Sequence, residues 1–332
     1  MKKNLLKFAK KFLPLIGLVL FIYLLISLGL EDIKNTILSI SPIYFIVSAL
    51  LTIPVLLIRN YAWQIILREQ KITVGYFKSL KILIIGFFYG TITPGYMGHA
   101  FRILYLKEET NEPYGKLFVN TFIDTIIRSF AQYGMMIFGA ILIIITFHES
   151  IFFYFTFGYF VISLLIIFYF LKKERGEKLF FTLIKYLIPK RLKTNLNRFV
   201  KTFYNEFPKT RVLIFPFFLG FIIWIIIFTQ VYLFVIALGL ETLIPYHYFI
   251  FLFPIANTAG FAPITFAGLG TRELTSIYIF QFFKAEEHKI LVFTLAGFIV
   301  TDLILAFVGF LFSLTEAGIK EKASLDEIFT NR

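Results

Sequence analysis

The chain has 332 residues, of which 58% are hydrophobic and only 16% are charged. A soluble globular protein carries about 25% charged residues, so this composition excludes an ordinary soluble domain. The formal net charge is +13, but the Lys and Arg residues lie beside the ends of apolar runs, where they face lipid headgroups, and nucleic acid is therefore not an expected partner. The sequence has no cysteine, no phosphate-binding loop and no metal-ligand spacing, so no cofactor is expected.

Several apolar runs are long enough to cross a bilayer, which takes about 20 helical residues. They predict an all-α, polytopic integral membrane protein with about six full spans. The first run follows a basic start and resembles a signal peptide, but it is too long and lacks a small-residue cleavage site, so a retained helix is expected. The predicted spans are Phe12–Leu30, Ile43–Leu67, Leu117–Phe147, Ile151–Leu171, Val212–Leu240 and Ile290–Thr315.

Two further apolar regions are interrupted by proline and glycine. Tyr76–Leu106 contains TPGYMGHAFR, and Tyr246–Phe283 contains PITFAGLGTRE. The arms after these breaks have about ten residues and reach about 15 Å, half of a hydrocarbon core of about 30 Å. Because such arms cannot cross, the sequence predicts two re-entrant helical hairpins.

The distribution of Lys and Arg predicts the topology. Residues 172–211 hold twelve of them, and five lysines precede Phe12. The positive-inside rule places both segments in the cytoplasm, together with the C-terminus. Tyr76–Leu106 must then enter from the cytoplasm and Tyr246–Phe283 from the outside. This topology puts 27 of the 33 basic residues on the inside and three on the outside, as expected for a multi-pass protein of the cell membrane.

The order of span, hairpin and span occurs twice, over residues 43–147 and 212–315. Together with the basic loop 172–211, the two units form a single transmembrane domain over residues 1–332. The tips Pro94–Arg102 and Ala267–Glu273 resemble each other, each having a two-glycine spacing. Paired broken helices in opposite orientations indicate an inverted-repeat transporter with its binding site between the breaks.

The second tip has the features of a helix start. Pro263 ends one half-helix, and Gly268 and Gly270 let the backbone turn. Thr271 can cap the next half-helix, whose positive N-terminal end, joined by Arg272, is a candidate anion site. The alternative is a tight surface loop in which the glycines only turn the chain.

Charged residues inside the spans are costly and mark candidate sites. Asp124 and Arg128 share one helix face, so they either pair with each other or reach the hairpin tips. Asp302 is central in its span, with Arg272 as the expected partner and proton coupling as the other role. Arg59 is expected to snorkel towards the headgroups. His99 is the one histidine at a tip.

The segments TPGYMGHAFRILYLKEETNEPYGKLFVNTFIDTIIRSF (Thr93–Phe130) and PITFAGLGTREL (Pro263–Leu274) resemble the transmembrane region of lysylphosphatidylglycerol synthases. The resemblance runs from about Leu13 to Leu314, and stand-alone relatives of that region have about this length. The resemblance covers Pro94, Gly95, Gly98 and Arg102 in the first hairpin, and Gly268, Gly270, Arg272 and Glu273 in the second.

In the full synthases this region is implicated in moving aminoacylated phospholipid between leaflets, while a separate soluble domain transfers the lysyl group. The present sequence ends at Arg332, so the resemblance implies translocation without aminoacyl transfer, and the chain is not expected to be an enzyme. Two positions depart from the family. Relatives commonly place an acid where this chain has His99-Ala100, and Arg128 reverses the sign at the end of DTIIR. The charge preference at the first hairpin is therefore expected to differ, and lysyl-lipid is not fixed as the substrate.

The expected function is a flippase-like translocase that moves a lipid or lipid-linked, phosphate-bearing headgroup. Membrane lipids with an anionic headgroup, or a lipid-linked substrate, are the expected partners, and a homo-oligomer or a synthase partner stays open. One alternative is an integral-membrane transferase with Asp124 or Asp302 as base, and another is an accessory subunit that recruits a synthase through residues 172–211. The candidate site comprises Pro94, Gly95, Gly98, Arg102, Asp124, Arg128, Gly268, Gly270, Arg272, Glu273 and Asp302.

Overall fold

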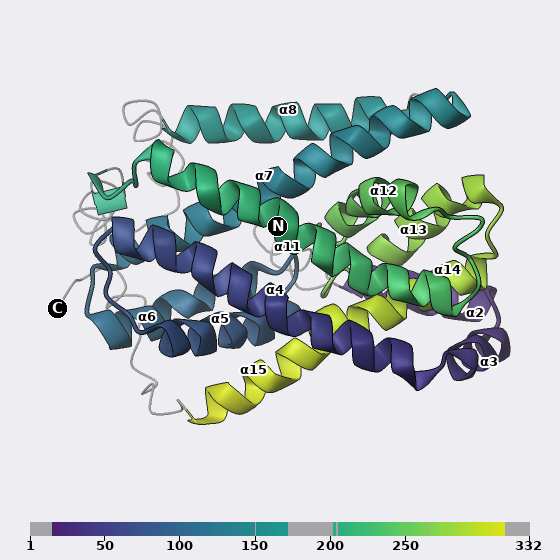
Figure 1. The fold of residues 1–332 in the computed structure, drawn as a ribbon, viewed down its shortest axis with the longest axis horizontal. Helices are drawn as coiled ribbons and strands as arrows, with labels where there is room; N and C mark the ends of the chain where they lie inside the picture. Colours follow the sequence, from purple (N-terminus) through teal and green to yellow (C-terminus); the bar gives the residue numbers. More distant parts are fainter. Residues whose placement is uncertain (1–14, 150, 172–201, 204, 264, 316–332) are drawn as a thin grey trace, which may run out of the picture.

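The computed structural model describes residues 15–149, 151–171, 202–203, 205–263 and 265–315 (Figure 1). Its secondary structure elements in these ranges are all helices, which confirms the all-α class. Most of the basic segment 172–211 and both chain ends lie outside the described residues. The loop and the cytoplasmic orientation of the termini therefore stay predictions.

The helices follow the two predicted units. The first part of the chain forms α2 (Leu15–Ser27), α3 (Leu30–Ser39), α4 (Pro42–Glu69), α5 (Tyr76–Thr91), η1 (Met97–Phe101), α6 (Arg102–Thr110), α7 (Tyr114–Phe147) and α8 (Ile151–Leu171). The second part forms α11 (Thr210–Ala237), α12 (Tyr246–Ala259), α13 (Thr271–Phe280), η3 (Gln281–Phe283), α14 (Glu287–Phe298), η4 (Ile299–Leu303) and α15 (Ile304–Thr315).

Within the described ranges, four helices are long and apolar enough to cross a membrane: α4, α7, α11 and the continuous helix from α14 through η4 to α15. They correspond to four of the predicted spans by length and composition, while the full count of six stays a prediction. The first predicted span is shorter than expected at its end. Gly29 adopts a φ of 82° between α2 and α3, so the chain turns there instead of continuing to Leu30 as one helix. The helix α3, with Glu31 and Asp32 in its first turn, was not predicted from the sequence.

The two interrupted regions fold as helical hairpins. Tyr89 of α5 stacks on Phe101 with 4.9 Å between ring centroids, and its hydroxyl lies 3.2 Å from that of Tyr105 in α6. Phe249 of α12 stacks on Phe280 of α13 at 5.4 Å. With 16 and 14 residues, α5 and α12 reach about 24 and 21 Å, short of a hydrocarbon core of about 30 Å. The proline and glycine breaks therefore divide these regions as the sequence predicts.

The helices of the two units pack in corresponding pairs. The first helices, α4 and α11, pack against each other, as their side-by-side course in Figure 1 shows. The hairpin helix α5 packs on α15 of the second unit, and the hairpin helix α12 packs on α7 of the first. Exchanging the units leaves this set of pairs unchanged. Each hairpin is therefore held by the last helix of the other unit.

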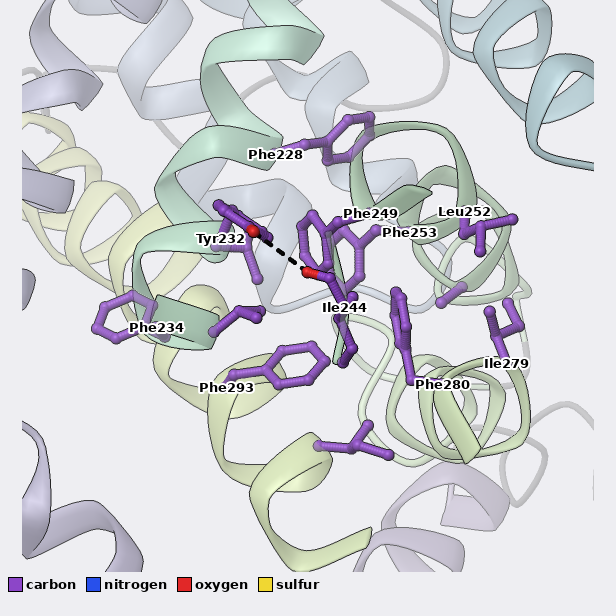
Figure 2. Packing of buried hydrophobic residues seen from close by; sticks show 14 of the residues in the cluster. Phe228, Tyr232, Phe234, Ile244, Phe249, Leu252, Phe253, Ile279, Phe280 and Phe293 are labelled. Carbon is purple, nitrogen blue, oxygen red and sulfur yellow. Dashed lines mark hydrogen bonds between the residues drawn. The ribbon is translucent and has the colours of Figure 1, made fainter. Parts of the chain in front are cut away.

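An aromatic core fixes the second hairpin. Phe249, Phe280 and Phe293 pack together, with ring centroids 5.4 to 5.8 Å apart, and join α12 and α13 to α14 (Figure 2). Tyr232 of α11 donates a hydrogen bond of 3.1 Å to the carbonyl of Ile244, so its hydroxyl is satisfied inside this apolar cluster. The same cluster thereby also anchors the turn between α11 and α12.

Polar side chains join α4 to α11. Gln230 donates to the carbonyl of Ser48 at 2.7 Å and to the hydroxyl of Thr52 at 2.8 Å, and Ser48 donates back to the carbonyl of Gln230 at 3.1 Å. Apolar surface gives little drive for helix association in lipid, so such interhelical hydrogen bonds and close packing hold the helices together. These three bonds link the two units directly.

One glycine in each supporting helix allows that helix to approach its hairpin closely. A Cβ on Gly139 of α7 would overlap the backbone carbonyl of Phe251 in α12, and one on Gly309 of α15 would overlap the carbonyl of Ile84 in α5. The glycines occupy corresponding places in the two units. Only a residue without a side chain allows the backbones to come this close.

We expect Gly139→Ala and Gly309→Ala each to destabilise the protein by about 1–3 kcal/mol, because the added methyl group forces the helices apart. The midpoint of thermal unfolding in detergent micelles measures the effect. Gly158→Ala in α8 is the matched control, since nothing lies within 4 Å of its added Cβ. The alanine preference of helices should leave that variant unchanged or up to about 1 kcal/mol more stable. Equal midpoints for all three variants would contradict the packing role.

Candidate functional site

The tips of the two hairpins meet. Pro94 and Phe266 form an isolated antiparallel bridge, and the amide of Gly95 donates to the carbonyl of Thr265 at 3.2 Å. The hydroxyl of Tyr96 donates to the carbonyl of Ala267 at 3.0 Å. Backbone that is neither helix nor sheet is tolerated at membrane depth only where protein or a water-filled cavity surrounds it. Each tip satisfies part of the other's backbone.

Glycine is required where the tips turn and touch. Gly95 has a φ of 60°, and a Cβ there would lie 3.0 Å from the Cα of Pro263 in the other tip. Gly268 has a φ of 76°, and its Cβ would lie 2.7 Å from the Cα of Gly260. A side chain at either position meets both the left-handed backbone and a neighbouring main chain. These glycines therefore shape the junction.

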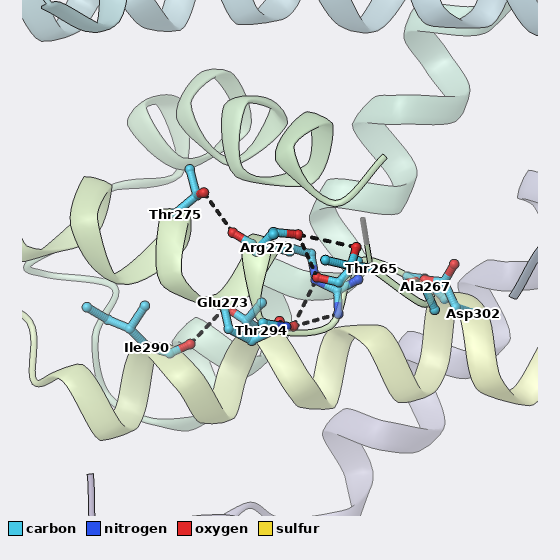
Figure 3. A network of polar contacts seen from close by, with 12 residues as sticks. Thr265, Ala267, Arg272, Glu273, Thr275, Ile290, Thr294 and Asp302 are labelled. Carbon is cyan, nitrogen blue, oxygen red and sulfur yellow. Dashed lines mark hydrogen bonds and ion pairs between the residues drawn. The ribbon is translucent and has the colours of Figure 1, made fainter. Parts of the chain in front are cut away.

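Glu273 neutralises the second tip (Figure 3). One of its carboxylate oxygens accepts from the amide of Gly270 at 2.6 Å, and the other accepts two bonds from Arg272, at 2.7 and 3.1 Å. The guanidinium of Arg272 also lies over the ring of Phe298, 4.6 Å from its centroid. The expected pairing of Arg272 with Asp302 is thus replaced by an adjacent partner.

The N-terminus of α13 differs from the prediction in one detail. Gly270, not Thr271, is the N-cap residue, and the hydroxyl of Thr271 donates instead to the carbonyl of Gly268 at 3.2 Å. The negative charge that complements this helix end is the carboxylate of Glu273, which is fully buried. The positive charge at the second tip is therefore neutralised by a residue of the same tip.

A buried ion pair anchors the first tip to α7. Arg102, the first residue of α6, donates to Asp124 at 2.7 Å and to the carbonyl of Thr121 at 3.0 Å. Its guanidinium also lies over the ring of Trp63, 4.7 Å from the centroid. The same oxygen of Asp124 accepts a longer bond of 3.4 Å from Arg128. Both sequence alternatives are therefore realised, since Asp124 pairs with its helix neighbour and with the hairpin.

A cavity of about 410 Å³ opens beside the junction. Its volume lies within the range of about 300–1,000 Å³ that is typical of small-molecule sites. Of the predicted site residues, Gly95, Arg128 and Asp302 line the cavity, and the others build the tips and their supports. Among the described residues the lining is formed by Arg59, Phe87, Gly95, Tyr96, Met97, His99, Ala100, Ile103, Phe118, Thr121, Phe122, Thr125, Arg128, Ser129, Tyr133, Trp224, Ile227, Asn257, Phe261, Thr301 and Asp302.

Arg59 is a cavity residue that the sequence analysis missed. It is 4% exposed and lies over the ring of Phe87, 4.3 Å from the centroid, so the expected snorkelling is wrong. The polar side chains that follow Arg59 in the same helix could have predicted its burial. Asn60 and Gln64, one and five residues further along α4, are buried and bond to the carbonyl of Tyr76 and the hydroxyl of Ser79. A helix with such a face packs against protein at that depth.

Asp302 lines the cavity from the second unit. It lies in η4, a π-helical turn between α14 and α15, and accepts a bond of 2.6 Å from the hydroxyl of Thr301. Single π turns inside α-helices occur frequently at functional sites. Figure 3 shows Asp302 on the α14–α15 ribbon, beyond the Arg272 and Glu273 network.

The chemistry of the cavity is that of a binding site for a charged group. Two guanidinium groups, Arg59 and Arg128, and one carboxylate, Asp302, line it together with aromatic and hydroxyl side chains. The described ranges contain no group of three or more His, Asp or Glu side chains placed to hold a metal ion. The described lining therefore carries two positive groups and one negative group.

The model of the family described as lysylphosphatidylglycerol synthase TM region matches residues 14–309, which include both hairpins and all cavity residues. The chain belongs to this family. The resemblance seen in the two motif segments is thereby confirmed. No curated protein matches the chain. Family membership and the four apolar helices identify a membrane protein, and the family suggests a part in lipid modification or transport.

We expect the Arg102–Asp124 pair to show strong energetic coupling. Arg102→Met or Asp124→Leu alone should cost about 3–5 kcal/mol, because the first leaves Asp124 with only its longer contact to Arg128, and the second leaves both arginines without a carboxylate. The double variant should cost much less than the sum of the two, as measured by a thermal unfolding cycle in detergent. Additive losses would show that the pair does not act as a unit.

Proposed function

We propose that the protein is a translocase that moves a lipid or lipid-linked substrate with a polar, phosphate-bearing headgroup across the membrane. The cavity at the junction of the two hairpin tips is the observation that carries this proposal. A flippase must shield a charged headgroup from hydrocarbon while the acyl chains stay in lipid. A partly polar cavity of about 410 Å³ among membrane-length helices meets that requirement.

The arrangement of the helices supports alternating access. In this proposal α5–α6 is a re-entrant hairpin from the cytoplasm and α12–α13 one from the outside, in an inverted repeat, with the termini in the cytoplasm. Each hairpin packs on the other unit's last helix, and hydrogen bonds join the units at α4 and α11. Rocking of one unit against the other would open the cavity to either leaflet, as in inverted-repeat transporters.

The position of the carboxylates favours transport over a transferase reaction. Asp124 accepts from both Arg102 and Arg128, so it is held as a charged anchor and is poorly suited to take a proton. Asp302 is the one carboxylate among the cavity residues that the structure describes. A single acid beside two arginines fits binding better than paired acid–base work.

We expect vesicles containing the protein to exchange fluorescent phospholipid between leaflets faster than protein-free vesicles. Ala100→Trp should reduce exchange to the protein-free rate, because Ala100 lines the cavity and the indole fills it. Quenching of the outer-leaflet fluorophore by dithionite measures the exchanged fraction.

The matched control is Ile145→Trp, which adds the same ring on an exposed face of α7, where Ile145 is 68% exposed. It should exchange lipid like the wild type. Exchange at the protein-free rate for every phospholipid tested would exclude a translocase. A lipid product of changed mass, lost in Asp302→Asn, would instead indicate the transferase.

A further inference from the structure

The cavity contains a buried cation without a protein partner. Arg102, Arg128 and Arg272 each pair with a carboxylate. Arg59 takes part in no ion pair with any described residue, and its Nε has no hydrogen-bond partner there. Its guanidinium lies over the ring of Phe87, 4.3 Å from the centroid. Leaving a buried guanidinium uncompensated is expensive, so its retention at membrane depth indicates a ligand or a pathway.

A second unsatisfied group lines the cavity from α7. The hydroxyl of Thr121 is buried and has no hydrogen-bond partner in the described part of the chain. Thr121, Thr125 and Ser129 all line the cavity, and their spacing of four residues puts them on one face of α7. This hydroxyl stripe extends about 12 Å along the helix, beside Arg128. The hydroxyl of Thr125 already donates to the carbonyl of Thr121 at 2.9 Å, so the hydroxyl of Thr121 and the guanidinium of Arg128 are the donors that this wall offers to an oxygen-rich ligand.

The charge balance indicates the valence of that ligand. Four arginines (Arg59, Arg102, Arg128 and Arg272) and three carboxylates (Asp124, Glu273 and Asp302) lie at the tips and the cavity, which leaves one excess positive charge. One of these carboxylates, Asp124, already binds two arginines. A ligand with a single negative charge would balance the site.

We propose that Arg59, together with Arg128 and the hydroxyl stripe of α7, is the binding site for a single phosphate diester. The planar guanidinium presents several donors in a fork that matches phosphate oxygens. A phosphate diester carries one negative charge and several acceptor oxygens, as the wall requires. This assignment rests on the proposed function for its biological source, a lipid headgroup, but the binding site itself is tested without transport.

The test measures binding to the full chain in uncharged maltoside micelles by titration calorimetry. The probes are dihexanoyl phosphatidylglycerol, dihexanoylglycerol, which lacks the phosphate, and inorganic phosphate. We expect saturable binding of the phosphatidylglycerol and none of the dihexanoylglycerol. Arg59→Gln should weaken binding at least about tenfold, the usual scale for one hydrogen bond to a charged group. Arg59→Lys should be intermediate, because it keeps the charge and loses the fork.

The control is Arg68→Gln, which removes the same charge from an exposed position on the same helix and should bind as the wild type does. Arg59→Met separates a ligand role from a structural one. Because Arg59 lacks a paired carboxylate, this variant should lose binding while its thermal unfolding midpoint stays equal or rises. Wild-type affinity in Arg59→Gln, or a lower midpoint in Arg59→Met, would overturn the assignment.

The probes also identify the source of the phosphate. Tighter binding of the phosphatidylglycerol than of inorganic phosphate supports a lipid headgroup, whereas equal binding supports a site for free phosphate. Equal binding of dihexanoylglycerol and phosphatidylglycerol would overturn the phosphate site. If wild-type binding and its Arg59 dependence are observed but leaflet exchange is absent, the translocase fails and the site stands. If leaflet exchange is observed but phosphatidylglycerol binding does not depend on Arg59, the binding site is rejected and the translocase proposal stands.

Discussion

The contact between the two hairpin tips is the constraint on which the rest of the structure depends. Each hairpin ends in irregular backbone, which lipid cannot solvate. Here the tips satisfy each other through the Pro94–Phe266 bridge and the bond from Gly95 to Thr265. The cost is a strict steric requirement at the glycines of the junction. The benefit is a fixed place for the cavity beside the junction of the two units.

The buried charges divide into two kinds. Arg102 with Asp124, and Arg272 with Glu273, hold the hairpin ends in place, and in each pair the charges are matched within the protein. Arg59 and Asp302 line the cavity and are not paired with an oppositely charged side chain in the described residues. Arg128 belongs to both groups, since it touches Asp124 at 3.4 Å and also lines the cavity. This division separates residues that build the site from residues available to a ligand.

The sequence predicts the helices better than their contacts. Apolar run length and the Pro/Gly breaks locate α4, α7, α11 and both hairpins, because these signals are local and strong. The partner of a charged side chain depends on which elements of the fold lie next to it, and local sequence signals do not reveal this. Arg272 was expected to reach Asp302, but Glu273 is adjacent and can also cap Gly270, so it satisfies two groups at once. Arg59 was expected at the headgroups because distance from a helix end does not reveal which neighbouring elements cover it. The buried polar face of Asn60 and Gln64 carried that information.

The most direct test is a disulfide between the tips, which the naturally cysteine-free chain makes possible. Residues opposite each other in an antiparallel bridge have Cα atoms about 4.5–5.5 Å apart, within the range for a disulfide. Pro94→Cys with Phe266→Cys should cross-link within one chain in native membranes on mild oxidation, as seen by mass spectrometry of the joined peptides. The control pair, Pro94→Cys with Ile145→Cys, should not cross-link. Failure of the first pair to cross-link, with both cysteines reactive towards a maleimide, would contradict the meeting of the tips.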